Sequence, residues 1–240
     1  MKFKKSASFF DFYCVLLIFV TRNCNPMNND LSQPISQRGS GEETEENSRI
    51  QEVADELNRR CQLYEAQLRE SQKHVNQHDL EAHVAELYAK EKKMWLPMEE
   101  VFHLGVPGPS GNENDTFVSN DIIYKVNNLL NCQGSILCLL EKVMCHNNLF
   151  YDTSYSLYAF TGFEGRTVLP VLQQNLVKNA EPATTVEIET YMAAIGFEKQ
   201  GNEGRFSNGE YEVWDLLPRN VLKDAEGDVF IVDAEIRFHR

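Results

Sequence analysis

Residues 215–222 read Asp-Leu-Leu-Pro-Arg-Asn-Val-Leu, and beyond a glycine turn residues 229–233 read Val-Phe-Ile-Val-Asp. Asp215, Asn220 and Asp233 therefore stand at the ends of short apolar strands, with spacings of five and thirteen residues. Three such oxygen ligands on one rim suit Mg²⁺, which takes its remaining ligands from water and substrate phosphates. Singly, each residue would be interpreted as a turn cap, a strand start or a surface acid. In combination they predict a metal and phosphate site.

This order of residues resembles the catalytic loop and metal-binding aspartate of the protein kinase-like fold. The resemblance implies that Asp215 positions the acceptor hydroxyl and takes its proton, and that Asn220 and Asp233 ligate the metal. Arg219, directly before the asparagine, is similar to the variant of this loop that is common in tyrosine kinases.

A kinase-like fold must also place a glycine-rich phosphate loop and a lysine earlier in the chain. Gly105, Gly108 and Gly111 lie between two strand-like runs, where glycines let backbone N–H groups approach phosphate closely. Lys125, within Ile-Ile-Tyr-Lys-Val at residues 122–126, resembles the lysine that contacts the α- and β-phosphates. An isolated lysine in a strand is usually just solvated, so this interpretation depends on its neighbours.

Two further positions follow from the resemblance. Glu141, in the helical run of residues 135–145, would pair with Lys125. It lies only five residues before His146, whereas kinases usually separate these positions by about two helical turns, so a surface charge is the alternative. Gln173 and Gln174, after the strand-like run 167–172, fall where a hinge would hold adenine through backbone groups.

The stretch from residue 95 to residue 236 is most similar to the kinase-like domain carried by polyvalent proteins of bacterial mobile elements. Four segments carry this resemblance: Gly-Asn-Glu-Asn at 111–114, Tyr-Lys-Val-Asn at 124–127, His-Asn-x-x-Phe at 146–150 and Leu-Pro-Arg-Asn-Val-Leu at 217–222. It implies an α+β, protein kinase-like fold, with an antiparallel N-lobe sheet, one main helix and a reduced C-lobe, that binds ATP and Mg²⁺.

Departures from typical protein kinases limit the prediction. Val213 and Trp214 stand where His and Arg usually precede the catalytic aspartate, and only seven residues follow Asp233, which leaves no activation segment. We therefore expect phosphate transfer from Mg-ATP to a hydroxyl of an unidentified protein or small molecule. The alternatives are a non-catalytic pseudokinase or interaction module, and a small-molecule kinase of the aminoglycoside type.

Short runs outline the rest of the domain at residues 95–240. Strands are expected at 101–104, 116–118, 121–126, 155–160, 167–172, 211–214, 221–222 and 229–232. A second helix is expected from Thr184, which has capping-box spacing to Glu187, up to Gly196.

The first 94 residues divide into three segments. Residues 1–24 pair three lysines with a short apolar run, as an export or anchoring segment (residues 1–20) would, although a true start at Met27 is an equal alternative. Residues 25–48 are polar and predict a disordered linker. Residues 49–94 predict an amphipathic helix, because Ile50, Leu57 and Tyr64 recur every seven residues. That helix would either lie on its own domain or self-associate through residues 49–93 as a coiled coil.

Composition sets the class of protein. With 42% hydrophobic and 25% charged residues, the 240-residue chain is typical of a globular protein. A formal charge of −13 argues against a protein that wraps nucleic acid, and no membrane partner is expected beyond the N-terminal segment. The six cysteines include no Cys-x-x-Cys pair, which favours reduced thiols and a cytoplasmic location.

Overall fold

The computed structural model describes residues 40–70, 75–201 and 204–238. The described part is a mixed α+β structure in which antiparallel sheets combine with five α-helices, as the sequence predicted for the fold class. The apolar segment predicted at residues 1–24 lies outside the described residues, as does most of the linker predicted at 25–48. No helix in the described ranges is both long and apolar enough to cross a membrane.

A five-stranded antiparallel sheet forms the first half of the fold. In spatial order its strands are β1 (Val106–Pro107), β2 (Asn114–Ser119), β3 (Ile122–Asn127), β5 (Thr167–Asn175) and β4 (Tyr155–Phe163). The strand predicted at 101–104 is wrong. The short helix α4 (Met98–Val101) occupies its start, since Pro97 precedes a first turn that carries Glu99 and Glu100, which favour a helix N-terminus. The chain pairs with β2 only from Val106 onward.

The two faces of this sheet differ in character. Successive residues of a strand point to opposite faces, so Val126 and Lys125 of β3 face opposite sides. One face carries an apolar cluster of Val101, Phe117, Val126, Ala159 and Val171. On the other face, Lys125 lines a cavity together with Leu139 and Val143 of the next helix. On this second face, the charged side chain of Lys125 therefore lies between the sheet and the next helix.

That helix is α5 (Ile136–Leu149), the main helix beside the sheet, at the position where the sequence predicted one. Ser135 caps its N-terminus by accepting a hydrogen bond from the backbone of Cys138. The buried carboxylate of Glu81 accepts hydrogen bonds from Ser135 Oγ and the Ile136 backbone N–H at 2.9 and 3.0 Å. A negative group at this end of a helix complements its dipole, so the start of α5 is firmly fixed.

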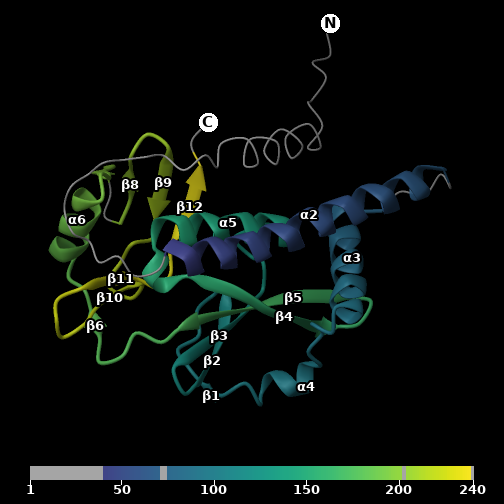
Figure 1. The fold of residues 1–240 in the computed structure, drawn as a ribbon, viewed down its shortest axis with the longest axis horizontal. Coiled ribbons are helices and arrows are strands. Elements are labelled where there is room, and N and C mark those ends of the chain that lie inside the picture. Colours follow the sequence, from purple (N-terminus) through teal and green to yellow (C-terminus); the bar gives the residue numbers. More distant parts are fainter. Residues whose placement is uncertain (1–39, 71–74, 202–203, 239–240) are drawn as a thin grey trace, which may run out of the picture. The chain divides into compact units, whose positions relative to one another are not determined.

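Residues 40–70 and 77–91 form two helices, where the sequence predicted a single helix over residues 49–94. α2 (Ser40–Glu70) begins inside the range predicted as linker, and α3 (Gln77–Glu91) starts where the side chain of Asn76 accepts a hydrogen bond from the backbone of His78. Arg49 pairs with Glu45 and Glu46 one turn earlier, which supports helix in the early part of α2. α2 lies beside α5 (Figure 1). Its buried apolar residues are Ile50, Val53, Ala54, Leu57 and Cys61.

The second half of the fold is a set of short strands around one helix. After the 3₁₀ turn η1 (Tyr151–Thr153) and the strands β4 and β5 come β6 (Glu181–Pro182), α6 (Thr185–Ala194), β7 (Glu198–Lys199), β8 (Phe206–Ser207), β9 (Tyr211–Trp214), β10 (Val221–Lys223), β11 (Val229–Ile231) and β12 (Glu235–Phe238). They form two sheets, in the orders β11-β10-β6 and β12-β9-β8-β7. The predicted capping box of Thr184 and Glu187 is confirmed at the start of α6.

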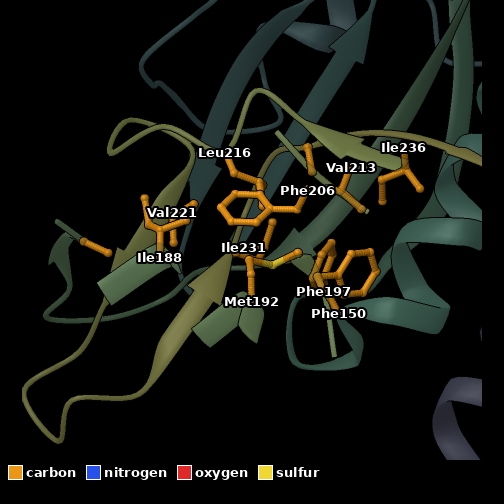
Figure 2. Packing of buried hydrophobic residues seen from close by; sticks show 12 residues of the cluster. Phe150, Ile188, Met192, Phe197, Phe206, Val213, Leu216, Val221, Ile231 and Ile236 are labelled. Atoms are coloured by element: carbon orange, nitrogen blue, oxygen red, sulfur yellow. The ribbon is translucent and has the colours of Figure 1, made fainter. Parts of the chain in front are cut away.

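This half has a hydrophobic core of its own (Figure 2). Met192 of α6, Phe206 of β8 and Ile231 of β11 meet in it, and each is at most 2% exposed. The complete buried set is Phe150, Ala183, Ile188, Met192, Phe197, Phe206, Val213, Leu216, Val221, Ile231, Ala234 and Ile236. Full burial of such side chains contributes about 1.5–3 kcal/mol each, so this small region has the means to hold its loops in place.

Candidate functional site

The loop after β9 brings Asp215 and Asn220 together. Asp215 has a left-handed backbone with φ of 61°, an uncommon conformation for a residue other than glycine. The amide nitrogen of Asn220 donates to both the backbone oxygen and carboxylate Oδ2 of Asp215, each at 2.8 Å. Arg219 donates to the other carboxylate oxygen, Oδ1. The carboxylate of Asp215 is thus oriented from two sides, while its side chain remains 38% exposed.

Asp233 joins these residues through the hairpin of β10 and β11. Val221 pairs with Ile231, and the backbone oxygen of Asn220 accepts hydrogen bonds from the N–H groups of Val232 and Asp233, at 3.0 and 3.3 Å. The twelve residues between Asn220 and Asp233 therefore form a β-hairpin that brings these two residues together. Among the described residues, no hydrogen bond or ion pair reaches the carboxylate of Asp233, which lines the cavity.

Buried neighbours hold each of the three polar residues. Leu216 follows Asp215, Val221 follows Asn220, and Ala234 follows Asp233. All three neighbours belong to the core shown in Figure 2. A residue directly before a fixed core position has little freedom of direction, so the core orients all three polar side chains.

Among the residues predicted upstream of this cluster, Lys125 is the one that reaches it in the described part of the chain. Its Nζ donates to the Tyr155 hydroxyl at 2.7 Å and to the backbone oxygen of Val232, next to Asp233, at 2.8 Å. Burial lowers the pKa of the Lys125 ammonium from its ordinary value, and the negative charge of Asp233 opposes that shift. Tyr155, which the sequence did not single out, also donates to the Val232 oxygen at 2.7 Å.

A second lysine, Lys142, faces the same cavity from α5. Its Nζ lies 2.8 Å from Oε1 of Glu235 and 3.3 Å from Oε2 of Glu113. Burial acts to lower the pKa of Lys142, but the two carboxylates outweigh it and the pKa is raised. Burial raises the pKa of Glu113, with the charge of Lys142 acting in the opposite sense. None of these three residues was predicted from the sequence.

Glu141, which the sequence placed opposite Lys125, is not among the residues that line this cavity. The hydrogen bonds of the Lys125 ammonium go to Tyr155 and Val232 instead. The inward face of α5 is formed by Leu139, Lys142, Val143 and His146. Their spacing of three and four residues is that of one helix face, and this signal points to Lys142 in place of its neighbour.

Gln173 lies inside the sheet rather than after it. β5 continues to Asn175, and Gln173 pairs with Tyr124 of β3 and Ser156 of β4. Its side chain donates to Ser156 Oγ at 3.0 Å. Its backbone therefore lies within the sheet, and the connection that leaves the sheet begins at Leu176. The strand therefore extends beyond residue 172, where the sequence predicted its end.

The three glycines lie in or next to the hairpin of β1 and β2. The Gly108 N–H bonds to the backbone oxygen of Thr116, and the Gly111 N–H bonds to that of Asn114. A Cβ at Gly105 would meet the backbone oxygen of Val118 at 2.3 Å, so this glycine is required by strand packing. A Cβ at Gly111 would meet nothing within 4 Å. Only the tip of the loop is open to a ligand.

Asn220 and Asp233 have the donor chemistry for a cation. The amide nitrogen of Asn220 is used by Asp215, which leaves its Oδ1 as the ligand atom, and the Asp233 carboxylate is unpaired among the described residues. Within the described ranges, no group of three His, Cys, Asp or Glu side chains forms a complete metal cage. The donor set fits Mg²⁺, which binds through one or two carboxylates and takes water and phosphate oxygens as well.

The cavity between these groups is small. Its volume is about 20 Å³, and the charged residues that line it are Glu113, Lys125, Lys142 and Asp233. A space of this size holds about one water molecule. Asp215 and Asn220 are not among the lining residues, so a nucleotide that reaches both Asp215 and Lys125 would have to extend beyond this cavity.

Comparison with known proteins identifies the family. No curated protein sequence matches the chain. Residues 78–240 match the sequence model of a family described as a serine/threonine/tyrosine kinase found in polyvalent proteins. The match begins in α3 and includes the whole sheet, α5 and every residue of the site. The chain therefore belongs to the family of serine/threonine/tyrosine kinases found in polyvalent proteins.

Proposed function

We propose that this protein is a minimal phosphotransferase that moves the γ-phosphoryl group of ATP to a hydroxyl acceptor. The sheet β1–β5 with α5 serves as the N-lobe, and β6–β12 with α6 serves as a reduced C-lobe. Family membership supports a kinase, and the placement of the polar residues supports the specific roles given below.

One observation carries the proposal. Lys125 Nζ lies 2.8 Å from the backbone oxygen of Val232, although 107 residues separate them. A lysine of the sheet is thereby brought next to Asp233, the residue with cation-binding chemistry. Phosphoryl transfer needs a cation at the phosphates and a carboxylate at the metal in one place, because catalysis depends on positioning and charge neutralisation.

Asp215 is the residue that handles the acceptor. Asn220 and Arg219 orient its carboxylate, and its partial exposure leaves room for a substrate hydroxyl. As the acceptor oxygen forms its bond to the γ-phosphorus, its proton passes to the Asp215 carboxylate. The bond from phosphorus to the bridging oxygen breaks, and ADP leaves with that electron pair. General-base catalysis of this kind contributes roughly 10²–10⁴-fold in rate.

Asn220 Oδ1 and the Asp233 carboxylate would hold Mg²⁺. When bound, the ion neutralises charge on the β- and γ-phosphates. Lys125, which lines the same cavity as Asp233, supplies a second positive charge, and its burial strengthens that electrostatic contact because little water screens it. The Gly111 N–H is bonded to the Asn114 backbone oxygen, so the loop tip would approach the phosphates through the open space at Gly111 rather than through that donor.

The test is transfer of label from γ-labelled ATP, with Mg²⁺, to the protein itself and to proteins of a host lysate. We expect wild-type protein to transfer phosphate and Asp215→Asn to lose at least about 100-fold of that rate. Asp121→Asn is the matched control, because Asp121 is an exposed aspartate that pairs with Lys178. The proposal fails if the wild type neither binds Mg-ATP nor transfers phosphate.

A pseudokinase is the second candidate, and two observations favour it. The cavity has room for about one water, and the Lys125 ammonium is already bonded within the protein. Thermal unfolding with Mg-ATP separates the two candidate functions. A ligand at a hundredfold its Kd adds about 2.7 kcal/mol to the free energy of unfolding. Stabilisation without any transfer assigns the protein to the non-catalytic class.

A further inference from the structure

Lys142 connects three parts of the chain that are far apart in sequence. It lies on α5, while Glu113 lies between Gly111 and the start of β2, and Glu235 starts the last strand, β12. Its Nζ contacts both carboxylates at once, at 3.3 and 2.8 Å. The lysine therefore joins the sheet, the main helix and the segment that follows Asp233.

This network is shielded from water. The side chains of Lys142, Glu113 and Glu235 are 14%, 10% and 16% exposed. Asn131 also donates to the Glu235 carboxylate at 2.5 Å, which orients it toward the lysine. Ion pairs in such a setting are hardly screened by salt, and removal of one partner leaves an uncompensated charge.

Without the lysine, the remaining charges would repel one another. Glu113, Glu235 and Asp233 all act on the pKa of the Lys142 ammonium, which places three carboxylates around it. Like charges at short distance repel one another, which favours either uptake of a proton by one carboxylate or movement of the segments that carry them. Of the three carboxylates, Glu113 lies nearest in sequence to the open loop tip at Gly111, and its backbone oxygen also accepts a hydrogen bond from the Asn128 N–H at 2.9 Å.

We propose that Lys142 is a positioning residue that tethers the glycine loop to the Asp233 segment through Glu113 and Glu235. Its catalytic consequence depends on the proposed phosphotransfer, whereas the tether itself does not. With the tether in place, the loop is held over the cavity that Lys125 and Asp233 line. Without it, phosphates would bind to a loop displaced from the metal site.

Amide hydrogen exchange of nucleotide-free protein measures the tether directly. In the wild type, the N–H groups of Gly108 and Gly111 are hydrogen-bonded across the hairpin. Lys142→Met should speed exchange in residues 108–116 by roughly tenfold or more, since the freed carboxylates drive the loop open. Lys142→Arg should leave exchange near the wild-type rate, because it keeps the charge.

Lys90→Met is the matched control. Lys90 also bridges two carboxylates, Glu86 at 2.8 Å and Glu164 at 3.0 Å, but it lies on α3 and outside the cavity. It should leave exchange of residues 108–116 unchanged. If Lys142→Met leaves that exchange unchanged, or if Lys90→Met speeds it equally, the tether is overturned.

Kinetics then test the consequence for transfer. Misplacement of the loop should lower kcat/KM for ATP by about 100-fold in Lys142→Met, and Lys142→Arg should restore most of it. Glu113→Gln combined with Lys142→Met should be no slower than Lys142→Met alone, because both changes cut one tether. Losses that multiply would overturn the positioning role.

Failure of the proposed function gives a different result. In that case the wild type and Lys90→Met would both transfer nothing, while the exchange experiment would still report the loop. Faster exchange in Lys142→Met alone would then support the tether without phosphotransfer. Normal exchange together with active, unchanged kinetics in Lys142→Met would overturn the tether and keep the kinase.

Discussion

The carboxylate side and the lysine side of the site are built in opposite ways. Asp215, Asn220 and Asp233 come from one continuous loop and hairpin, and their backbone hydrogen bonds link them directly. Lys125 and Lys142 come from a strand and a helix, and their partners are scattered from residue 113 to residue 235. Local chain geometry therefore sets the first side, and tertiary packing sets the second.

Their solvent exposure differs accordingly. The side chains of Asp215 and Arg219 are 38% and 63% exposed, whereas those of Lys142 and Glu113 are 14% and 10% exposed. Exposed charges are screened and free to meet a substrate. The buried charges of Lys142 and Glu113 are already paired with each other, so they stabilise the fold rather than bind a substrate. The exposed side of the site should therefore control chemistry, and the buried side should control stability and alignment.

The sharpest way to break this comparison is Asp233→Asn, where the two sides meet. The change keeps the shape and removes the charge from the only unpaired carboxylate that the described residues bring to the cavity. We expect phosphoryl transfer to fall by at least about 100-fold, because a charge that acts on the phosphates through the metal is lost. Label transfer measured across a Mg²⁺ titration checks this.

The control for Asp233→Asn is a measurement of the stability of the folded protein. Urea unfolding should show only a small loss of stability in Asp233→Asn, since no hydrogen bond or ion pair of the described residues ends on this carboxylate and only its charge near Lys125 is lost. Activity that survives the substitution would show that Asp233 is not a metal ligand. The carboxylate side would then have a structural role, and the proposed division between a side that controls chemistry and a side that controls stability would be wrong.

A smaller effect is expected on stability when a buried side chain is shortened in the core beside the loop that carries Asn220. Ile231 is 1% exposed and pairs with Val221, next to Asn220. Ile231→Ala should lower the free energy of unfolding by about 2–5 kcal/mol, because it removes packed methyl groups and leaves a cavity. Urea unfolding gives the value.

Val229→Ala is the companion variant for this change. Val229 lies on the same strand but is only partly buried against the core. Its effect should therefore be clearly smaller than that of Ile231→Ala. Equal losses in the two variants would mean that the core of Figure 2 does not anchor the loop selectively.

The sequence could predict the carboxylate side because its determinants are local. Apolar runs that end at Asp215 and Asp233 or begin after Asn220 predicted strands, and β9, β10 and β11 lie at those positions. A hairpin closes over few residues, so spacing alone nearly determines which residues meet. The fold class followed from the same pattern.

On the lysine side, Lys125 was predicted from the sequence but Lys142 was not, because the helix α5 is apolar around most of its circumference. Leu137, Leu139 and Leu140 are all buried, since the helix packs against the sheet, α2 and α3. A helix buried on several sides gives no clear polar face, so the inward position of Lys142 over Glu141 was hidden. Only the sheet and the cavity reveal the orientation.

The displaced end of β5 has a different cause. The amide side chains of Gln173 and Gln174 resembled a strand end, but inside the sheet they bond to Ser156 Oγ and the Thr153 backbone oxygen. Polar residues that find partners in this way are accommodated in a strand. The strand therefore continues past the predicted hinge.

A pH experiment tests the buried lysine side. His146 lines the cavity and is 2% exposed, and burial together with the charge of Lys125 lowers its pKa to about 3. The unfolded chain binds a proton below about pH 6.5, while the folded protein does not. The folded state therefore loses stability as pH falls from 6.5 toward 3, by about 2 kcal/mol at pH 5.

His146→Gln isolates this contribution. Glutamine supplies a donor for the Thr153 backbone oxygen, which His146 Nε2 contacts at 3.1 Å, but it does not titrate. Urea unfolding at pH 7.5 and pH 5 should show a smaller loss in the variant than in the wild type. An equal loss in both would mean that His146 is not held neutral beside Lys125.

The smallest expected effect concerns the glycine loop, where one glycine is available for a ligand and another is needed for packing. Gly111 lies outside the left-handed region, and a Cβ at this position would meet no atom within 4 Å, so Gly111→Ala should stabilise the protein by about 0.4–1 kcal/mol through the unfolded chain. Gly105→Ala should instead destabilise it, because its Cβ would lie 2.3 Å from the Val118 oxygen. Thermal unfolding checks both. If Gly111→Ala weakens Mg-ATP binding although the protein is more stable, the loop tip contacts the phosphates. If binding is unchanged, only Lys125 and the metal contact the phosphates.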